Sequence, residues 1–201
     1  QTSRKTAAMR LIIKPLTRDL TPDYLDFFDK RAFSDNNPCG PCYCVGPSMD
    51  AAAEQQMVKE FGKDVKGVVR RYAVALLAQE KIHGYLAFDD DKSIAWCNAG
   101  NRDDYVSRIP EQARQSVCGK TLSVVCFAIA PEYRGLGVAT ALLDRVISDA
   151  RANGYAAVEG YAKVQKNRVD YDYHGPIRLY EKAGFVEMLR LDEVVVMRKE
   201  G

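Results

Sequence analysis

The sequence predicts an α/β domain built on a mixed sheet, and three patterns indicate this class. A nearly unbroken apolar run at 121–130 is rich in β-branched residues and is typical of a strand buried on both faces. An amphipathic stretch at 136–150 carries apolar residues at helical spacing, and 156–161 returns as a strand, which completes a strand–helix–strand unit. Two alternating segments at 82–88 and 93–98 flank an acidic turn and predict an antiparallel hairpin. Parallel and antiparallel pairs in one chain give a mixed sheet.

The remaining elements complete this layout in chain order. The other expected strands are 10–16, 185–189 and 194–198. The other expected helices are 21–33, 50–61, a stretch capped by Asp64, and 176–183. A loop rich in Pro, Gly and Asn spans 35–47, and 99–120 is polar and irregular. We find no internal repeat and no interdomain linker, so one domain is expected over 9–201.

Composition restricts the class of protein further. The 201 residues are 47% hydrophobic and 28% charged, which is ordinary for a globular protein and excludes fibrous and disordered chains. A net charge of +2 gives no broad field for nucleic acid or an anionic membrane, so neither partner is expected. With no long apolar stretch and no signal-peptide pattern, we expect a cytoplasmic protein with residues 1–8 as a loose or added tail. The six cysteines are expected to be free thiols.

The most informative segment lies between the buried strand and the amphipathic helix. Arg134 is followed by Gly135 and Gly137 at the predicted helix N-terminus. Small residues there let a ligand approach the backbone, and the unpaired N–H groups and helix dipole favour an anion such as a pyrophosphate. A tight strand-to-helix turn alone would explain one glycine but not the whole pattern. The segment therefore predicts a phosphate site.

This segment resembles the phosphate loop of the GNAT superfamily of acetyl-CoA-dependent N-acetyltransferases, which has Arg or Gln, two residues, Gly, one residue, and Gly or Ala. Arg134, Gly137 and Ala139 match that pattern. The later stretch Leu179-Tyr180-Glu181-Lys182-Ala183-Gly184-Phe185 resembles the Leu-Tyr-x-x-x-Gly-Phe element of the family. The resemblance covers 121–198. It departs where the family often has Asn and Ala before the tyrosine, because Tyr173 and Pro176 stand there.

The resemblance implies a fold, a cofactor and its contacts. The central sheet would be splayed, with the pantetheine arm of acetyl-CoA lying in the gap beside the strand that precedes the phosphate loop. The resemblance implies backbone hydrogen bonds to that arm from Phe127, Ala128 and Ile129. The Phe127 amide would polarise the thioester carbonyl. The residues implied to hold the pyrophosphate are Arg134, Gly135, Leu136, Gly137, Val138, Ala139 and Thr140.

The chemistry requires two proton movements. Tyr180 occupies the family's general-acid position and would protonate the leaving thiolate. An amine with a pKa near ~10.4 must lose a proton before it attacks. Glu159 is the first expectation for that base, because a carboxylate in a mostly apolar strand has a partner or lines a wet cleft. Asp172 and His174 remain alternatives, and the scarcity of histidine favours direct transfer over an acyl-enzyme.

The acceptor is less defined by the sequence. The loop at 34–47, with Trp96, Asn98 and Tyr173, would shape the acceptor site for a small-molecule amine or a peptide or protein amine. Cys39, Cys42 and Cys44 invite a zinc interpretation, but no fourth ligand stands nearby, so no metal is expected. Cys126 is expected in the core, with acyl chemistry as a minor alternative. A homodimer is left open.

Two other functions compete with this one. The glycines followed by Glu159 imitate a dinucleotide-binding fingerprint, but Thr140 replaces its third glycine and too little chain remains to complete that sheet. A catalytically silent acyl-CoA-binding sensor or interaction domain of the same fold is the second alternative.

Overall fold

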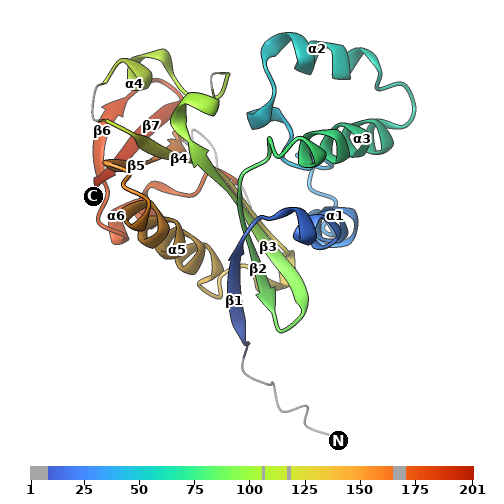
Figure 1. Cartoon of the computed structure of the whole chain (residues 1–201), viewed down its shortest axis with the longest axis horizontal. Helices are drawn as coiled ribbons and strands as arrows, with labels where there is room; N and C mark the ends of the chain where they lie inside the picture. The colour runs from blue at the N-terminus through green and yellow to red at the C-terminus, as the bar shows by residue number, and fades with distance from the viewer. Residues whose placement is uncertain (1–8, 106, 117–118, 165–170) are drawn as a thin grey trace, which may run out of the picture.

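A seven-stranded mixed sheet forms the centre of the molecule, as predicted, in the order β1-β2-β3-β4-β5-β7-β6 (Figure 1). The computed structural model describes residues 9–105, 107–116, 119–164 and 171–201, so the predicted tail at 1–8 and Cys118 lie outside the described residues. The strands are β1 (Leu11–Pro15), β2 (Gly84–Asp89), β3 (Lys92–Asn101), β4 (Thr121–Ile129), β5 (Ala157–Lys163), β6 (Val186–Arg190) and β7 (Val194–Glu200). Strands β4 and β5 pair in parallel, and the other neighbours pair antiparallel.

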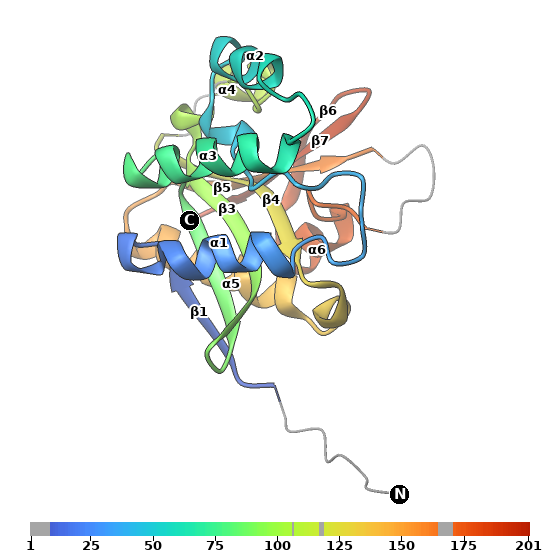
Figure 2. The ribbon, with the colours of Figure 1, turned by 90° about the vertical axis from the view of Figure 1, so that its right-hand side faces the viewer.

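Helices cover both faces of this sheet (Figures 1 and 2). They are α1 (Thr21–Lys30), α2 (Ala51–Lys59), α3 (Val65–Ala78), α4 (Glu111–Gln115), α5 (Val138–Ala152) and α6 (Ile177–Lys182). One hydrophobic core lies under α5 and α6, and a second lies under α1 and α3. Within the described ranges, no helix is both long and apolar enough to cross a membrane.

The helix ends follow mostly from local sequence. Asp50 and Asp64 cap α2 and α3, each accepting a backbone N–H at 2.8 Å. Helix α1 ends at Lys30, before the predicted Phe33. Helix α5 starts at Val138, two residues later than predicted, because the left-handed conformation of Gly137 makes that glycine the N-cap.

Strands β4 and β5 diverge and open the sheet at its centre. Their parallel pairing joins Thr121–Val124 to Ala157–Gly160. Beyond it, β4 continues along β3 while β5 continues along β7. The register between β3 and β4 passes from Asn98 opposite Cys126 to Ala99 opposite Val124, so Val125 forms a bulge in β4. This is the splayed arrangement that the resemblance implied, with a gap along the second half of β4.

Candidate active site

The turn from β4 into α5 exposes its backbone. Gly135 and Gly137 have φ values of +75° and +82°, a left-handed conformation that side chains disfavour. A Cβ on either glycine would meet no described atom within 4 Å. The N-terminus of α5 therefore faces open space, with its first N–H groups and the positive end of its dipole directed outward. This geometry can receive an anion.

The side chains of the predicted phosphate loop differ in exposure. Leu136 is 57% exposed and Thr140 is also exposed, so neither is held by the core. Val138 is 1% exposed and packs against β4 and α5 neighbours, and Ala139 is half-buried. Val138 can therefore offer a bound anion only its backbone.

Arg134 is held by protein groups on several sides. Its Nη1 atom lies 2.6 Å from Asp35 Oδ2, and its Nε donates to the Ile129 carbonyl at 3.1 Å. Its guanidinium lies 4.2 Å from the ring centroid of Tyr171. Burial raises the pKa of Asp35, but the hydrogen bond and positive charge of Arg134, together with backbone hydrogen bonds, lower the pKa overall. Among the described residues the buried Nη2 atom has no hydrogen-bond partner, so one donor of the predicted phosphate ligand is unused.

The gap beside β4 is bridged by residues 171–175, which we call the strap. The Phe127 N–H donates to the Tyr173 carbonyl at 2.6 Å, and the Tyr171 hydroxyl donates to the Phe127 carbonyl at 3.0 Å. The Tyr171 and Tyr173 rings stack edge to face, with centroids 4.6 Å apart. The strap thus uses both backbone groups of Phe127 that were predicted to bind pantetheine.

The three β4 residues predicted to bind pantetheine direct their backbone groups to different sides of the strand. The Phe127 N–H and carbonyl point into the gap, and the Ile129 carbonyl accepts from Arg134 there. Ala128 lies opposite Trp96 of β3, and the Ala130 N–H donates to the Ile94 carbonyl of the same strand. Because alternate residues of a strand direct their backbone groups to opposite sides, Ala128 faces β3 rather than the gap. The expected pantetheine contact from Ala128 is corrected accordingly.

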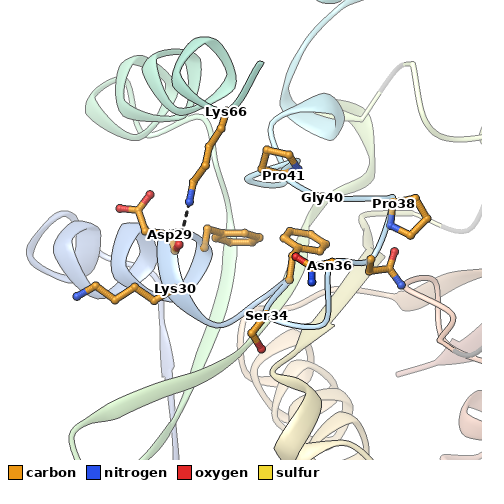
Figure 3. A pocket seen from close by; sticks show the side chains of 11 residues that line it. Asp29, Lys30, Ser34, Asn36, Pro38, Gly40, Pro41 and Lys66 are labelled. Atoms are coloured by element: carbon orange, nitrogen blue, oxygen red, sulfur yellow. Dashed lines mark hydrogen bonds between the residues drawn. The ribbon is translucent and has the colours of Figure 1, made fainter. Parts of the chain in front are cut away.

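A cavity of about 410 Å³ opens between α1, the start of α3 and the loop after α1 (Figure 3). Lys66 crosses it and donates to the Asp29 carbonyl at 2.9 Å. Phe33 lines both this cavity and a larger one on the β4 side. The loop at 34–47 therefore stands between two hollows.

The larger cavity, which we call the acceptor cavity, measures about 560 Å³ and lies beside the bulged part of β4. It is lined by the segment after α1, by β4, by the ends of β5 and β7, and by the strap. The lining residues are Phe33, Cys39, Cys42, Cys44, Gly46, Pro47, Ser107, Arg108, Val125, Cys126, Tyr161, Lys163, Tyr173, His174 and Val194. Residues of the loop at 34–47 and Tyr173 therefore form part of the wall of this cavity.

The profile of the Acetyltransferase (GNAT) family matches residues 49–185, more than half of the chain. The chain belongs to the GNAT acetyltransferase family. This confirms the resemblance that the phosphate loop and the later Leu-Tyr element carried. No curated protein sequence matches the chain.

Solved structures share the GNAT fold at low sequence identity. YncA, a proposed acetyltransferase from Salmonella typhimurium solved with acetyl-CoA, is 14% identical with a TM-score of 0.53, covering 94% of this chain and 93% of its own. PaiA N-acetyltransferase from Thermoplasma acidophilum, solved with coenzyme A, is 14% identical with a TM-score of 0.51, covering 96% and 100%. A chain of the NatC complex bound to Gag peptide and CoA is 14% identical with a TM-score of 0.54, covering 96% and 99%.

Tyr180 of the GNAT chain contacts the strap near its C-terminal end, at His174. It is fully buried, its hydroxyl donates to the His174 carbonyl at 2.6 Å, and its ring packs on Phe127 and Phe185. A Cβ on Gly160 would lie 2.1 Å from this ring, so the glycine makes room for it. Burial raises the pKa of Tyr180 well above its usual value, so the phenol keeps its proton.

Glu159 has charged partners, the first of the two environments expected for it, and does not line the acceptor cavity. The side chain is 0% exposed, and Arg198 donates to it at 2.6 and 2.9 Å. Arg102 contacts it at 3.5 Å, and the Tyr161 hydroxyl donates at 2.8 Å. Two guanidinium groups and a tyrosine hydroxyl thus enclose the carboxylate, and it does not line the acceptor cavity. The structure therefore corrects the expectation that Glu159 is positioned to take a proton from substrate.

The other candidate bases lie on the strap. His174 lines the acceptor cavity, and its Nδ1 is 3.3 Å from Asp172 Oδ1. The Asp172 carboxylate also accepts the His174 backbone N–H at 2.9 Å. Both residues belong to the strap, which occupies the backbone N–H and carbonyl of Phe127.

The cysteines are the residues on which a zinc site would depend. Within the described part of the chain, no group of three or more His, Cys, Asp or Glu side chains could hold a metal ion. Cys39, Cys42, Cys44, Cys97 and Cys126 are free thiols.

Sequence reasoning missed several residues of the acceptor cavity, notably Tyr161, Lys163 and Arg108. Strand alternation places Tyr161 on the same face of β5 as Glu159, but no motif marked Tyr161 as a site residue. Arg108 comes from the irregular stretch after β3, where no periodic signal exists. The predicted Trp96 and Asn98 lie fully buried beneath the cavity rather than in its lining.

Proposed function

We propose that this GNAT-family chain is an N-acetyltransferase that moves the acetyl group of acetyl-CoA directly to a primary amine. The observation that carries the proposal is the open, left-handed glycine turn at the N-terminus of α5, beside the gap between β4 and β5. An anion-binding helix terminus next to a splayed strand suits a ligand that combines a pyrophosphate with an extended amide arm.

Two sets of residues fit such a cofactor, one for its pyrophosphate and one for its amide arm. Backbone groups from Gly135 to Thr140 would hold the pyrophosphate, with the unused Nη2 donor of Arg134 as a further contact. Phe127 and Ile129 would pair with the amide arm. Acetyl-CoA supplies an acetyl group activated as a thioester. YncA and PaiA, which bind acetyl-CoA and coenzyme A, support this assignment by fold.

The proposed proton donor is Tyr180, and the proposed oxyanion donor is the Phe127 N–H. Tyr180 retains its proton because of its burial, which suits a group that protonates a leaving thiolate. The Phe127 N–H would stabilise the developing oxyanion once the Tyr173 carbonyl leaves it. Glu159 would act as a positioning residue that holds Tyr161 at the floor of the cavity.

The acceptor is proposed to enter the acceptor cavity as a small-molecule amine or as the amine of a peptide or protein. The cavity volume of about 560 Å³ lies within the range of small-molecule sites. The NatC chain, solved with Gag peptide and CoA, shares the fold and is consistent with a peptide acceptor.

A second candidate function is a catalytically silent acyl-CoA-binding domain. One observation favours it: the strap occupies the backbone of Phe127 and the hydroxyl of Tyr180 at the same time. In a sensor, displacement of the strap by ligand would itself be the signal.

Thermal unfolding with acetyl-CoA, and with NADH as a control, tests both candidates first. A ligand that binds only the folded state raises the midpoint. A shift with acetyl-CoA alone supports the cofactor assignment, and release of the CoA thiol with a panel of amines then separates the enzyme from the sensor. A shift with NADH alone contradicts both.

A further inference from the structure

Cys44 stands at the wall of the acceptor cavity in an unusual backbone conformation. Tyr43 and Cys44 are consecutive residues with φ values of +43° and +48°, a region that residues with side chains seldom adopt. The conformation is held from α1, where the Tyr24 hydroxyl donates to the Tyr43 carbonyl at 2.5 Å. Such backbone strain persists where surrounding contacts fix it, and it clusters at functional sites.

The Cys44 sulfur is surrounded by hydrogen-bond donors. Asn98 Nδ2 donates to it at 3.2 Å, and the Tyr105 hydroxyl donates to Asn98 Oδ1 at 2.6 Å. The tyrosine thereby fixes the orientation of the amide, so that its NH₂ group must face the sulfur. The indole Nε1 of Trp96 is fully buried and, among the described residues, lacks a well-aligned partner. These groups form a built, buried site that favours negative charge on sulfur.

The pKa values of Cys44, Cys126 and Cys42 shift in different directions. A hydrogen bond from Cys126 lowers the pKa of Cys44 more than burial raises it, and the hydrogen bond from Asn98 and the charge of Arg108 lower it further. The same hydrogen bond, with burial, raises the pKa of Cys126, and burial raises the pKa of Cys42 to about 12. The ionisable groups that interact electrostatically with Cys44 are Tyr24, Cys42, Cys97, Tyr105, Arg108 and Cys126.

The other bases near the cavity are less well placed. Of the described residues that line it, none is Asp or Glu, and Glu159 is enclosed by arginines. His174 lies on the strap, next to the Tyr173 carbonyl that holds the Phe127 N–H, so it must move when a cofactor takes that hydrogen bond. Cys44 is held by a hydrogen bond from Asn98 of β3 and, through the Tyr43 carbonyl, by one from Tyr24 of α1, and neither bond involves the strap.

We infer that the Cys44 thiolate is the proton acceptor for the amine substrate in the acceptor cavity. The inference rests on the proposed function and replaces Glu159 in that role. An ammonium group entering the cavity transfers one proton to the Cys44 sulfur, which becomes a thiol, and the neutral amine attacks the thioester carbon. The carbon–sulfur bond breaks, the second amine proton passes to the departing thiolate through Tyr180, and Cys44 returns its proton to solvent. One amide and one free CoA thiol result, with one proton released.

The thiolate is tested first in the protein without cofactor. We expect the ultraviolet absorbance of a thiolate to appear in the wild type below the ordinary cysteine pKa of ~8.5 and to be lost in Cys44→Ser. Cys97→Ser is the matched control, because Cys97 is fully buried in β3 but does not line the acceptor cavity, and it keeps the signal. Tyr105→Phe frees the Asn98 amide and shifts the titration to higher pH, which keeps the test available if Cys44→Ser folds poorly. An identical titration in the wild type and Cys44→Ser overturns the inference.

Kinetics then test the role. We expect Cys44→Ser to lose about 100-fold in kcat/KM for the amine at neutral pH. The loss shrinks toward pH ~10.4, where the free amine no longer needs a base. In Tyr105→Phe the pH–rate profile moves with the thiolate titration. A loss that is equal at every pH, or no loss, overturns the inference.

Two further measurements separate this inference from its alternatives. Mass spectrometry of protein incubated with acetyl-CoA alone should find Cys44 unmodified, whereas an acetylated Cys44 would make it a nucleophile and overturn the role as base. Acetyl-CoA binding and wild-type turnover are measured in the same preparations. Absence of both defeats the proposed function itself, and turnover without dependence on Cys44 defeats only the inference.

Discussion

The proposed cofactor site has two parts, the phosphate loop and the backbone of β4 at Phe127. They differ in whether protein groups already occupy them. At the phosphate loop, Gly135 and Gly137 leave open space in front of α5. Along the Phe127 edge, the strap makes the hydrogen bonds that an amide arm would make. The first part is preformed for an anion, and the second must be vacated. Binding at the second part therefore costs the free energy of displacing the strap, which reduces the apparent affinity.

The two parts are coupled through Arg134 and the strap. Arg134 belongs to the phosphate loop, yet its guanidinium packs on the Tyr171 ring of the strap. Tyr180 donates to the strap at its other end, through the His174 carbonyl. An anion that draws Arg134 away would remove one support of the strap. The phosphate end of a cofactor would then help its own arm to enter.

The largest expected effect is at the preformed part. Gly137→Glu places a carboxylate where the phosphate binds and should weaken acetyl-CoA binding about 1,000-fold, the cost of losing two hydrogen bonds to a charged group. Gly154→Glu is the matched control, because Gly154 also has a left-handed φ of +69° and a Cβ there would meet no described atom within 4 Å, but it lies at the other end of α5. Calorimetric titration measures both. Equal losses in the two variants would trace the effect to backbone strain.

A substitution at Tyr180 tests whether the residue that contacts the strap also acts in catalysis. Tyr180→Phe should lower kcat about 100-fold, the usual contribution of a general acid, while acetyl-CoA affinity stays nearly intact. Tyr72→Phe is the control, because its hydroxyl donates to Glu60 at 2.8 Å on the surface of α3. Steady-state kinetics with any accepted amine make the measurement. Unchanged kcat would assign Tyr180 to packing against Phe127 and Phe185.

The difference between the two parts also explains what the sequence could predict. The glycine turn before α5, the Asp64 cap of α3 and the buried strand β4 depend on neighbouring residues, and local patterns predicted them. The strap depends on contacts between residues more than forty positions apart in sequence, such as Tyr171 with Phe127. Glu159 shows the same limit, because its partner Arg198 comes from the closing strand and no local pattern pairs them. The departure at Tyr173 was the one signal of the strap in the sequence.

Weakening the strap tests whether it competes with the amide arm of the cofactor for the backbone of Phe127. Tyr171→Phe removes the hydroxyl that donates to the Phe127 carbonyl and keeps the ring under Arg134. A net hydrogen bond of about 1 kcal/mol favours the strap, so its loss should raise acetyl-CoA affinity about fivefold. Affinity for a phosphate-only fragment such as adenosine 3′,5′-diphosphate should not change. A fall in acetyl-CoA affinity would mean that Tyr171 contacts the cofactor itself.

The smallest expected effect concerns the Asp35 carboxylate, which competes with phosphate for Arg134. The pair is partly exposed, so solvent screening limits its strength to about 0.5 kcal/mol, and Asp35→Asn should raise acetyl-CoA affinity roughly twofold. Because the pKa of Asp35 is lowered in the folded protein, its stabilising effect is complete above the unfolded value of ~3.9 and is lost as the pH falls through the folded pKa. The wild type and Asp35→Asn should therefore differ in midpoint of thermal unfolding at neutral pH and converge in acid. Glu187→Gln, which breaks a distant surface pair with Arg190, should leave acetyl-CoA affinity unchanged. If it raises affinity as much as Asp35→Asn does, general charge rather than release of Arg134 is the cause.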